Sequence, residues 1–111
     1  MHIYKFTDRR GDTMDAYLVR AAYYDNSLAV EMVTNSDGYW EPWATVTVNL
    51  GRAMGRFAFL DTNNFPDGPK FLEDNGLAVP TGDMAASGYC TYPLYEFTDK
   101  FFAECEEYGE E

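Results

Sequence analysis

The chain has 111 residues, of which 46% are hydrophobic and 17% aromatic, a composition that excludes an intrinsically disordered protein. This length suits a single domain over residues 1–111 that folds around one core. The formal net charge of −11 argues against direct binding to nucleic acid or to an anionic membrane, because both contacts need clustered Lys and Arg.

The negative charge is concentrated in the second half of the chain. Residues 1–56 hold seven carboxylates and six basic residues, whereas residues 57–111 hold twelve carboxylates and only Lys70 and Lys100. Such an imbalance favours a basic protein partner. The alternative is that the negative charge only keeps the protein soluble.

Alternating apolar and polar residues, separated by turn-forming clusters, predict short strands in the first 60 residues. The predicted strands are 2–7, 13–24, 28–34, 39–50 and 56–60. Pro42 is expected to break the fourth, in which Val46, Val48 and Leu50 are predicted to face one way. The polar set of that strand faces the other way: Thr45, Thr47 and Asn49. The short connections favour antiparallel hairpins.

A brief helix and an extended segment are predicted next. The helix covers 69–75 and is stopped by Gly76, with Phe71 and Leu72 facing inward. Residues 77–86 are expected to be irregular. Residues 87–97 are expected to form a strand at a sheet edge or bent at Pro93, because proline cannot donate to a ladder.

A C-terminal helix is predicted after Thr98, which is a suitable cap. Phe101, Cys105 and Tyr108 are spaced i, i+4 and i+7, with Phe102 beside them, and form an apolar stripe that faces the sheet. The predicted fold is therefore α+β: a curved antiparallel sheet of about five or six strands, with one short helix and the C-terminal helix packed on it.

No residue pattern indicates an enzyme, a cofactor site or a metal site. His2 is the only histidine of the sequence, and Cys90 and Cys105 lack the companion ligands of a zinc site. The loop 61–72 lacks the carboxylates and the glycine of a calcium loop. We expect free thiols in a reducing cytoplasm, and no window approaches an apolar membrane span.

Two groups of residues are candidates for binding a partner. Aromatic residues of the first half form either an exposed recognition surface or the cover of a sheet: Tyr23, Tyr24, Tyr39, Trp40 and Trp43. Carboxylates of the second half are the other group: Glu96, Asp99, Glu104, Glu106, Glu107, Glu110 and Glu111. The helix macrodipole disfavours anions at a C-terminal end by about 0.3–1 kcal/mol each. Either that end frays, or its charges serve a partner.

Three strings carry a resemblance: TVNL at 47–50, AFLDTNNFPDGPKFLEDNGLAVPTG at 58–82 and SGYCTYPLYEF at 87–97. They resemble a bacterial family of small domains of unknown function that is carried on conjugative elements, plasmids and phages. The resemblance covers the last half to two thirds of the chain and implies no catalytic residue. Genes carried on such mobile elements often encode inhibitors of host defence, namely anti-CRISPR and antirestriction proteins.

The resemblance and the charge together suggest a function. A defence nuclease holds DNA in a positively charged channel, which a surface of carboxylates can occupy. We therefore expect a cofactor-free inhibitor, a monomer or a homodimer, that binds a Cas or restriction subunit and blocks its access to nucleic acid. One alternative is an interaction module of a mobile element without an inhibitory role. Another is a small-molecule binder that uses the Tyr and Trp cluster.

Overall fold

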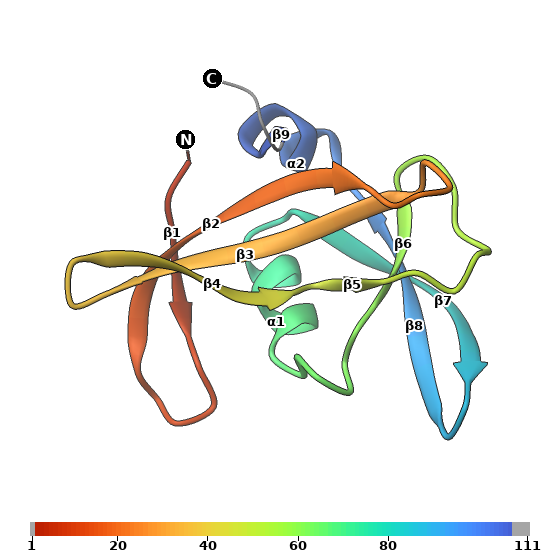
Figure 1. Cartoon of the computed structure of the whole chain (residues 1–111), viewed down its shortest axis with the longest axis horizontal. Coiled ribbons are helices and arrows are strands. Elements are labelled where there is room, and N and C mark those ends of the chain that lie inside the picture. Colours follow the sequence, from red (N-terminus) through yellow and green to blue (C-terminus); the bar gives the residue numbers. More distant parts are fainter. Residues whose placement is uncertain (1, 108–111) are drawn as a thin grey trace.

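The computed structural model describes residues 2–107 of the chain and contains two β-sheets with two short helices (Figure 1). The first sheet has the order β1-β2-β3-β4 and is antiparallel along this path. Its strands are β1 (Tyr4–Thr7), β2 (Thr13–Ala22), β3 (Leu28–Ser36) and β4 (Tyr39–Thr45). A short strand near the C-terminus, β9 (Glu106–Glu107), pairs in parallel with β2.

The second sheet has the order β5-β6-β8-β7 and is antiparallel throughout. Its strands are β5 (Thr47–Val48), β6 (Phe57–Leu60), β7 (Ala78–Ser87) and β8 (Cys90–Phe97). The helices are α1 (Gly68–Asp74) and α2 (Asp99–Glu104). The predicted α+β class is confirmed, but the strands are divided between two sheets instead of forming one curved sheet.

The β3–β4 hairpin closes with a two-residue turn. Asp37 and Gly38 both have positive φ, 58° and 87°, while Ser36 and Tyr39 pair across the ladder. A two-residue turn with positive φ at both positions matches the right-handed twist of its strands. Pro42 does not end β4, because the ladder absorbs it with a register shift between Met32 and Val33 of β3.

The chain passes from the first sheet to the second at Val46 and Thr47. The Val46 N–H donates to the Val30 carbonyl at 2.8 Å, and the Val46 carbonyl accepts from the Asp61 N–H at 2.9 Å. The prediction that Thr47 lies on a polar face is wrong, since Thr47 is 2% exposed. Its hydroxyl oxygen accepts from the Val30 N–H at 3.1 Å and is 2.9 Å from the Tyr23 hydroxyl. Internal hydrogen bonds thus replace the water that this side chain was expected to contact.

Residues 78–87 form a strand, which corrects the prediction of an irregular segment. The pairing of β7 with β8 shifts register between Pro80 and Met84, and the Thr81 hydroxyl donates to the Leu94 carbonyl inside this bulge. The bulge interrupts the alternation by which strands are recognised. β8 is an inner strand instead of an edge strand, and Pro93 lies just beyond the part of β8 that pairs with β6.

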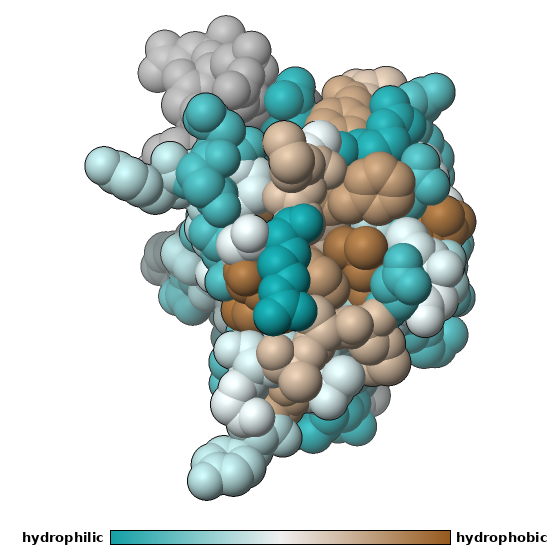
Figure 2. Space-filling view, turned by 90° about the vertical axis from the view of Figure 1, so that its right-hand side faces the viewer, coloured by the Kyte–Doolittle hydropathy of each residue, from teal (hydrophilic) through white to brown (hydrophobic). Residues whose placement is uncertain are grey.

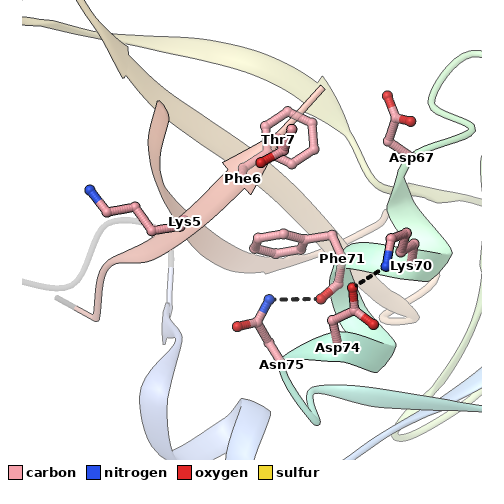
Figure 3. Close-up of a pocket in the computed structure, with 8 residues that line it drawn as sticks. All are labelled: Lys5, Phe6, Thr7, Asp67, Lys70, Phe71, Asp74 and Asn75. Atoms are coloured by element: carbon pink, nitrogen blue, oxygen red, sulfur yellow. Dashed lines mark hydrogen bonds and ion pairs between the residues drawn. The ribbon is translucent and has the colours of Figure 1, made fainter. Parts of the chain in front are cut away.

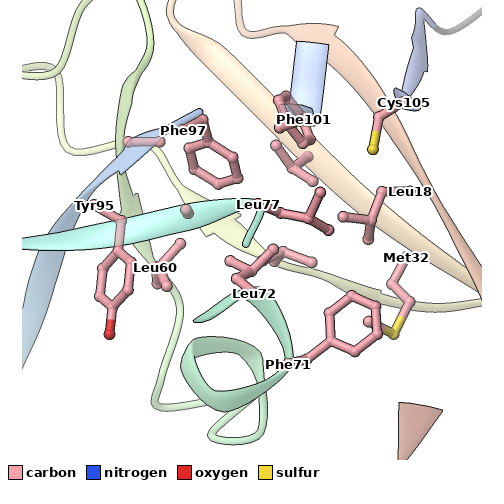
Figure 4. Close-up of a cluster of buried hydrophobic side chains, with 14 of the residues drawn as sticks. Leu18, Met32, Leu60, Phe71, Leu72, Leu77, Tyr95, Phe97, Phe101 and Cys105 are labelled. Atoms are coloured by element: carbon pink, nitrogen blue, oxygen red, sulfur yellow. The ribbon is translucent and has the colours of Figure 1, made fainter. Parts of the chain in front are cut away.

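One hydrophobic core lies between the two sheets and α1 (Figure 4). Every large side chain at its centre is at most 2% exposed, and these side chains include Phe6, Leu18, Met32, Leu60, Leu72, Leu77, Phe97 and Phe101. As predicted, Phe71 and Leu72 turn inward from α1, and Phe71 packs edge-on against Phe6. The Tyr95 hydroxyl donates to Glu73 Oε2 at 2.7 Å and ties α1 to the inner face of β8.

Replacement of Thr47 by Val tests the connection between the sheets. Thr47→Val keeps the shape of the side chain but leaves the buried Val30 N–H without its acceptor, so we expect a loss of about 1–3 kcal/mol in the free energy of unfolding. Urea denaturation followed by circular dichroism measures it. The matched control is Thr45→Val on the exposed edge strand β4. Equal stability of the two variants would contradict the role assigned to Thr47.

Candidate protein-binding surfaces

The predicted cap of α2 is confirmed, and the helix is shorter than expected. The Thr98 hydroxyl oxygen accepts from the Phe101 N–H at 3.3 Å. The helix ends at Glu104, after which the chain becomes extended and β9 joins β2. Phe101 and Cys105 are buried as the predicted stripe requires, whereas Tyr108 lies outside the described residues.

Two arginines outside α2 hold the helix in place. The Arg56 guanidinium lies 2.9 Å from Asp99 Oδ1, and its carbon is 5.6 Å from the centre of the Phe102 ring. The Arg20 guanidinium lies 5.7 Å from the centre of the same ring, and its Nε donates to the Cys105 carbonyl at 3.1 Å. Cation–π contacts of this kind stabilise an exposed site by about 0.5–1 kcal/mol. Asp99 therefore has a cationic neighbour within the domain.

Glu104 is also engaged within the domain. The Tyr4 hydroxyl donates to Glu104 Oε1 at 2.5 Å, and His2 Nε2 lies 3.6 Å from the same oxygen. Burial and the Glu104 carboxylate raise the pKa of Tyr4. The Cys105 thiol lies 3.9 Å from the Tyr4 hydroxyl, and burial raises its pKa to about 11. These contacts join the two ends of the described chain.

The predicted acidic surface is thus only partly free of internal partners. No ion pair among residues 2–107 involves Glu96, which lies on β8. Glu106 and Glu107 pair through their backbones with Val19 and Arg20 of β2. Glu110 and Glu111 lie outside the described residues.

Three residues of the predicted aromatic group lie on β4, an edge strand of the first sheet (Figure 1). On β4, Tyr39 is 71% exposed, while Trp40 and Trp43 are 41% and 39% exposed. The Trp40 ring packs 5.1 Å from the ring of Tyr17, and the Trp43 ring packs 5.8 Å from that of Phe6. The two indoles therefore both cover the sheet and present an edge to solvent.

The other two aromatic candidates differ from each other. Tyr23 is partly buried, with its hydroxyl against Thr47, whereas Tyr24 is fully exposed. The five aromatic residues thus include well-packed and freely accessible rings.

A surface that the sequence reasoning missed covers the second sheet on the side away from the core. Phe57 of β6 and Val79 of β7 both stand opposite Glu96 of β8, so the three form one row across the sheet. Phe57 is 37% exposed and Val79 46% exposed. A neighbouring row consists of Val48, Phe59 and Leu94, of which Phe59 is only 5% exposed and the other two are half-buried. We call these two rows the outer face.

Figure 2 views the molecule from the side on which β6, β7 and β8 lie, and shows apolar side chains gathered among hydrophilic ones. A signal for this surface is present in the sequence. The strand FAFL at Phe57–Leu60 is apolar at every position, so apolar residues occur on both of its faces.

A hollow of about 370 Å³ lies between β1 and α1 (Figure 3). Of its charged residues, Lys70 Nζ lies 2.6 Å from Asp74 Oδ2 and Lys5 pairs with Asp15, whereas Asp67 has no ion pair among residues 2–107. Among residues 2–107, no group of three or more His, Cys, Asp or Glu side chains is arranged to hold a metal ion.

Comparison with known proteins identifies the family. Residues 17–111 match the model of a family described as a domain of unknown function, DUF4313. The chain therefore belongs to this family, and the match extends further toward the N-terminus than the resemblance in the three strings. No curated protein and no solved structure matches the chain. None of the helices in the described part of the chain is long and apolar enough to cross a membrane.

The environment of Cys105 predicts an unreactive thiol. With a pKa of about 11, only about a thousandth of this thiol is thiolate at pH 8, and burial adds a steric barrier. In a Cys90→Ser variant, which leaves Cys105 alone, we expect a thiol reagent such as DTNB to react only after unfolding in guanidinium. The Cys105→Ser variant leaves only the partly exposed Cys90, whose rate of reaction with DTNB serves for comparison. Equally fast reaction of Cys105 in the folded and unfolded protein would contradict this account.

Proposed function

We propose that this domain inhibits a bacterial defence system by binding a DNA-targeting effector, such as a Cas or restriction subunit, and blocking its access to nucleic acid. The observation that carries the proposal is the excess of carboxylates. If each of the eight Lys and Arg paired with one of the 19 Asp and Glu, 11 carboxylates would remain without a cation. Arg20 and Arg56 are moreover occupied in holding α2.

The physical basis of inhibition is competition for a basic channel. An effector channel that attracts phosphates also attracts a carboxylate-rich domain, and complementary potentials raise the association rate. Such binding needs no catalytic group. It weakens as salt screens the charges, because the Debye length falls from about 10 Å at 0.1 M to about 3 Å at 1 M.

Internal contacts make some of the carboxylates unsuitable for a charge-reversal test of this contact. Asp99 and Glu104 have internal partners, and reversal of Glu104 would break its hydrogen bond with Tyr4 and disturb the fold. Glu96 has no ion pair among the described residues. Glu107 belongs, like Glu96, to the acidic second half of the sequence, and reversal of these two charges tests the contact.

A plasmid-interference assay against a panel of CRISPR–Cas and restriction systems tests the proposal. We expect the wild-type domain to restore plasmid transformation against at least one system. The double variant Glu96→Lys, Glu107→Lys is expected to lose this effect, because the reversed charges repel a basic channel. The matched control, Glu31→Lys with Glu41→Lys, makes the same change in net charge in the first half of the sequence, on β3 and β4.

Two outcomes would contradict the proposal. One is the absence of inhibition across the panel together with capture of a relaxosome or replication protein from a host lysate. That result would favour the interaction module without an inhibitory role. The other is equal inhibition by the wild type and by the Glu96 and Glu107 variant, which would remove the acidic second half from the contact.

A further inference from the structure

We propose that the outer face of the second sheet is the docking surface, and that its occupant is a segment of the partner with apolar side chains flanked by Lys or Arg. This inference rests on the proposed function and specifies the partner's chemistry. It replaces a purely electrostatic contact with one that is apolar and acidic together.

One row of side chains crosses β6, β8 and β7 on the outer face. Phe57 and Val79 both stand directly opposite Glu96, and side chains at directly opposite positions in antiparallel strands have Cβ atoms about 4.5–5.5 Å apart. One carboxylate therefore lies between an exposed aromatic ring and an exposed aliphatic side chain. A partner group that fills this row meets apolar surface on two sides of an anion.

The opposite face of the same strands shows that the apolar character of the row does not serve the core. Ala58 and Tyr95 form the next row and are 2% and 5% exposed, and Phe97 and Ala78 are fully buried. The core of the domain thus takes Ala58, Ala78, Tyr95 and Phe97 from these strands. Phe57 and Val79 remain on the side where the described residues leave them open to solvent.

The edges of this sheet are poor sites for an added strand. The outer strand β7 contains Pro80, a register shift before Met84 and Gly82 with a φ of 92°. The other edge strand, β5, has two residues. Prolines, bulges and short strands are the devices that prevent strand addition at a sheet edge. The face, rather than the edge, is therefore available for docking.

Charge selects the kind of occupant. A second copy of this chain would also carry a net charge of −11, and a two-fold contact through this face would bring Glu96 toward its own counterpart. A partner segment with Lys or Arg beside apolar side chains instead pairs with Glu96 and covers Phe57 and Val79. Burial of this apolar area favours association, against the entropic cost of bringing the two molecules together.

A peptide titration followed by NMR of the ¹⁵N-labelled domain tests the inference. The probes are short synthetic peptides of alternating Arg and Leu, of alternating Arg and Ser, and of alternating Glu and Leu. We expect the Arg–Leu peptide to shift the backbone amide signals of β6, β7 and β8 and to bind at least about tenfold more tightly than the other two. Signals of β4 are expected to stay in place.

Two variants separate the apolar and the acidic parts of the row. Phe57→Ser with Val79→Thr keeps every charge, and Glu96→Lys keeps the apolar side chains. Each is expected to weaken binding of the Arg–Leu peptide about tenfold or more. The matched controls on the first sheet, Trp40→Ser and Glu41→Lys, are expected to bind as the wild type does. Dispersed amide spectra and melting temperatures confirm that each variant is folded.

The results distinguish failure of this inference from failure of the proposed function. Shifts confined to β4, equal binding of the Arg–Leu and Arg–Ser peptides, or no binding would overturn the docking surface. In the plasmid assay, inhibition that is lost with Glu96→Lys, Glu107→Lys but kept with Phe57→Ser, Val79→Thr would preserve the function and overturn the apolar row. Peptide binding at the outer face by a domain that inhibits no system would preserve the surface and overturn the function.

Discussion

The structure depends on the passage of the chain between its two sheets at Val46 and Thr47. Val46 bonds through its N–H to β3 and through its carbonyl to Asp61, and the buried Thr47 hydroxyl joins Val30 to Tyr23. These bonds satisfy polar groups where the chain leaves one ladder for the other, and unsatisfied groups at that point would be costly. Because the polar groups at this crossing are hydrogen-bonded, the two small sheets can pack around one core. The outer face of the second sheet then lies on the side away from that core.

Local patterns predicted much of the secondary structure. Alternation located β2 and β3, and Gly76 marked the end of α1. The division into two sheets could not be predicted, because it depends on hydrogen bonds between Val46 and residues far away in the sequence. β7 was missed for a different reason, since its bulge conceals the period of two that identifies a strand.

The candidate site was predicted less completely than the fold. Glu96 was identified from the charge asymmetry, but Phe57 and Val79 were not, because only the register across three strands brings them into its row. The engagement of Glu104 by Tyr4 and of Asp99 by Arg56 also depends on tertiary contacts. Charge counting therefore identifies the half of the chain that carries the anions, whereas the fold decides which of them are free to meet a partner. Glu96, which has no ion pair among the described residues, lies beside apolar surface, which favours a mixed contact over a uniformly charged one.

Hydrogen–deuterium exchange, measured on the domain alone and in complex with the effector identified in the plasmid assay, tests the central claim most directly. If the partner docks on the outer face of the second sheet, backbone amides of β6, β7 and β8 gain protection in the complex while those of β4 exchange at an unchanged rate. Protection that appears along β4, with none in the second sheet, would contradict the account.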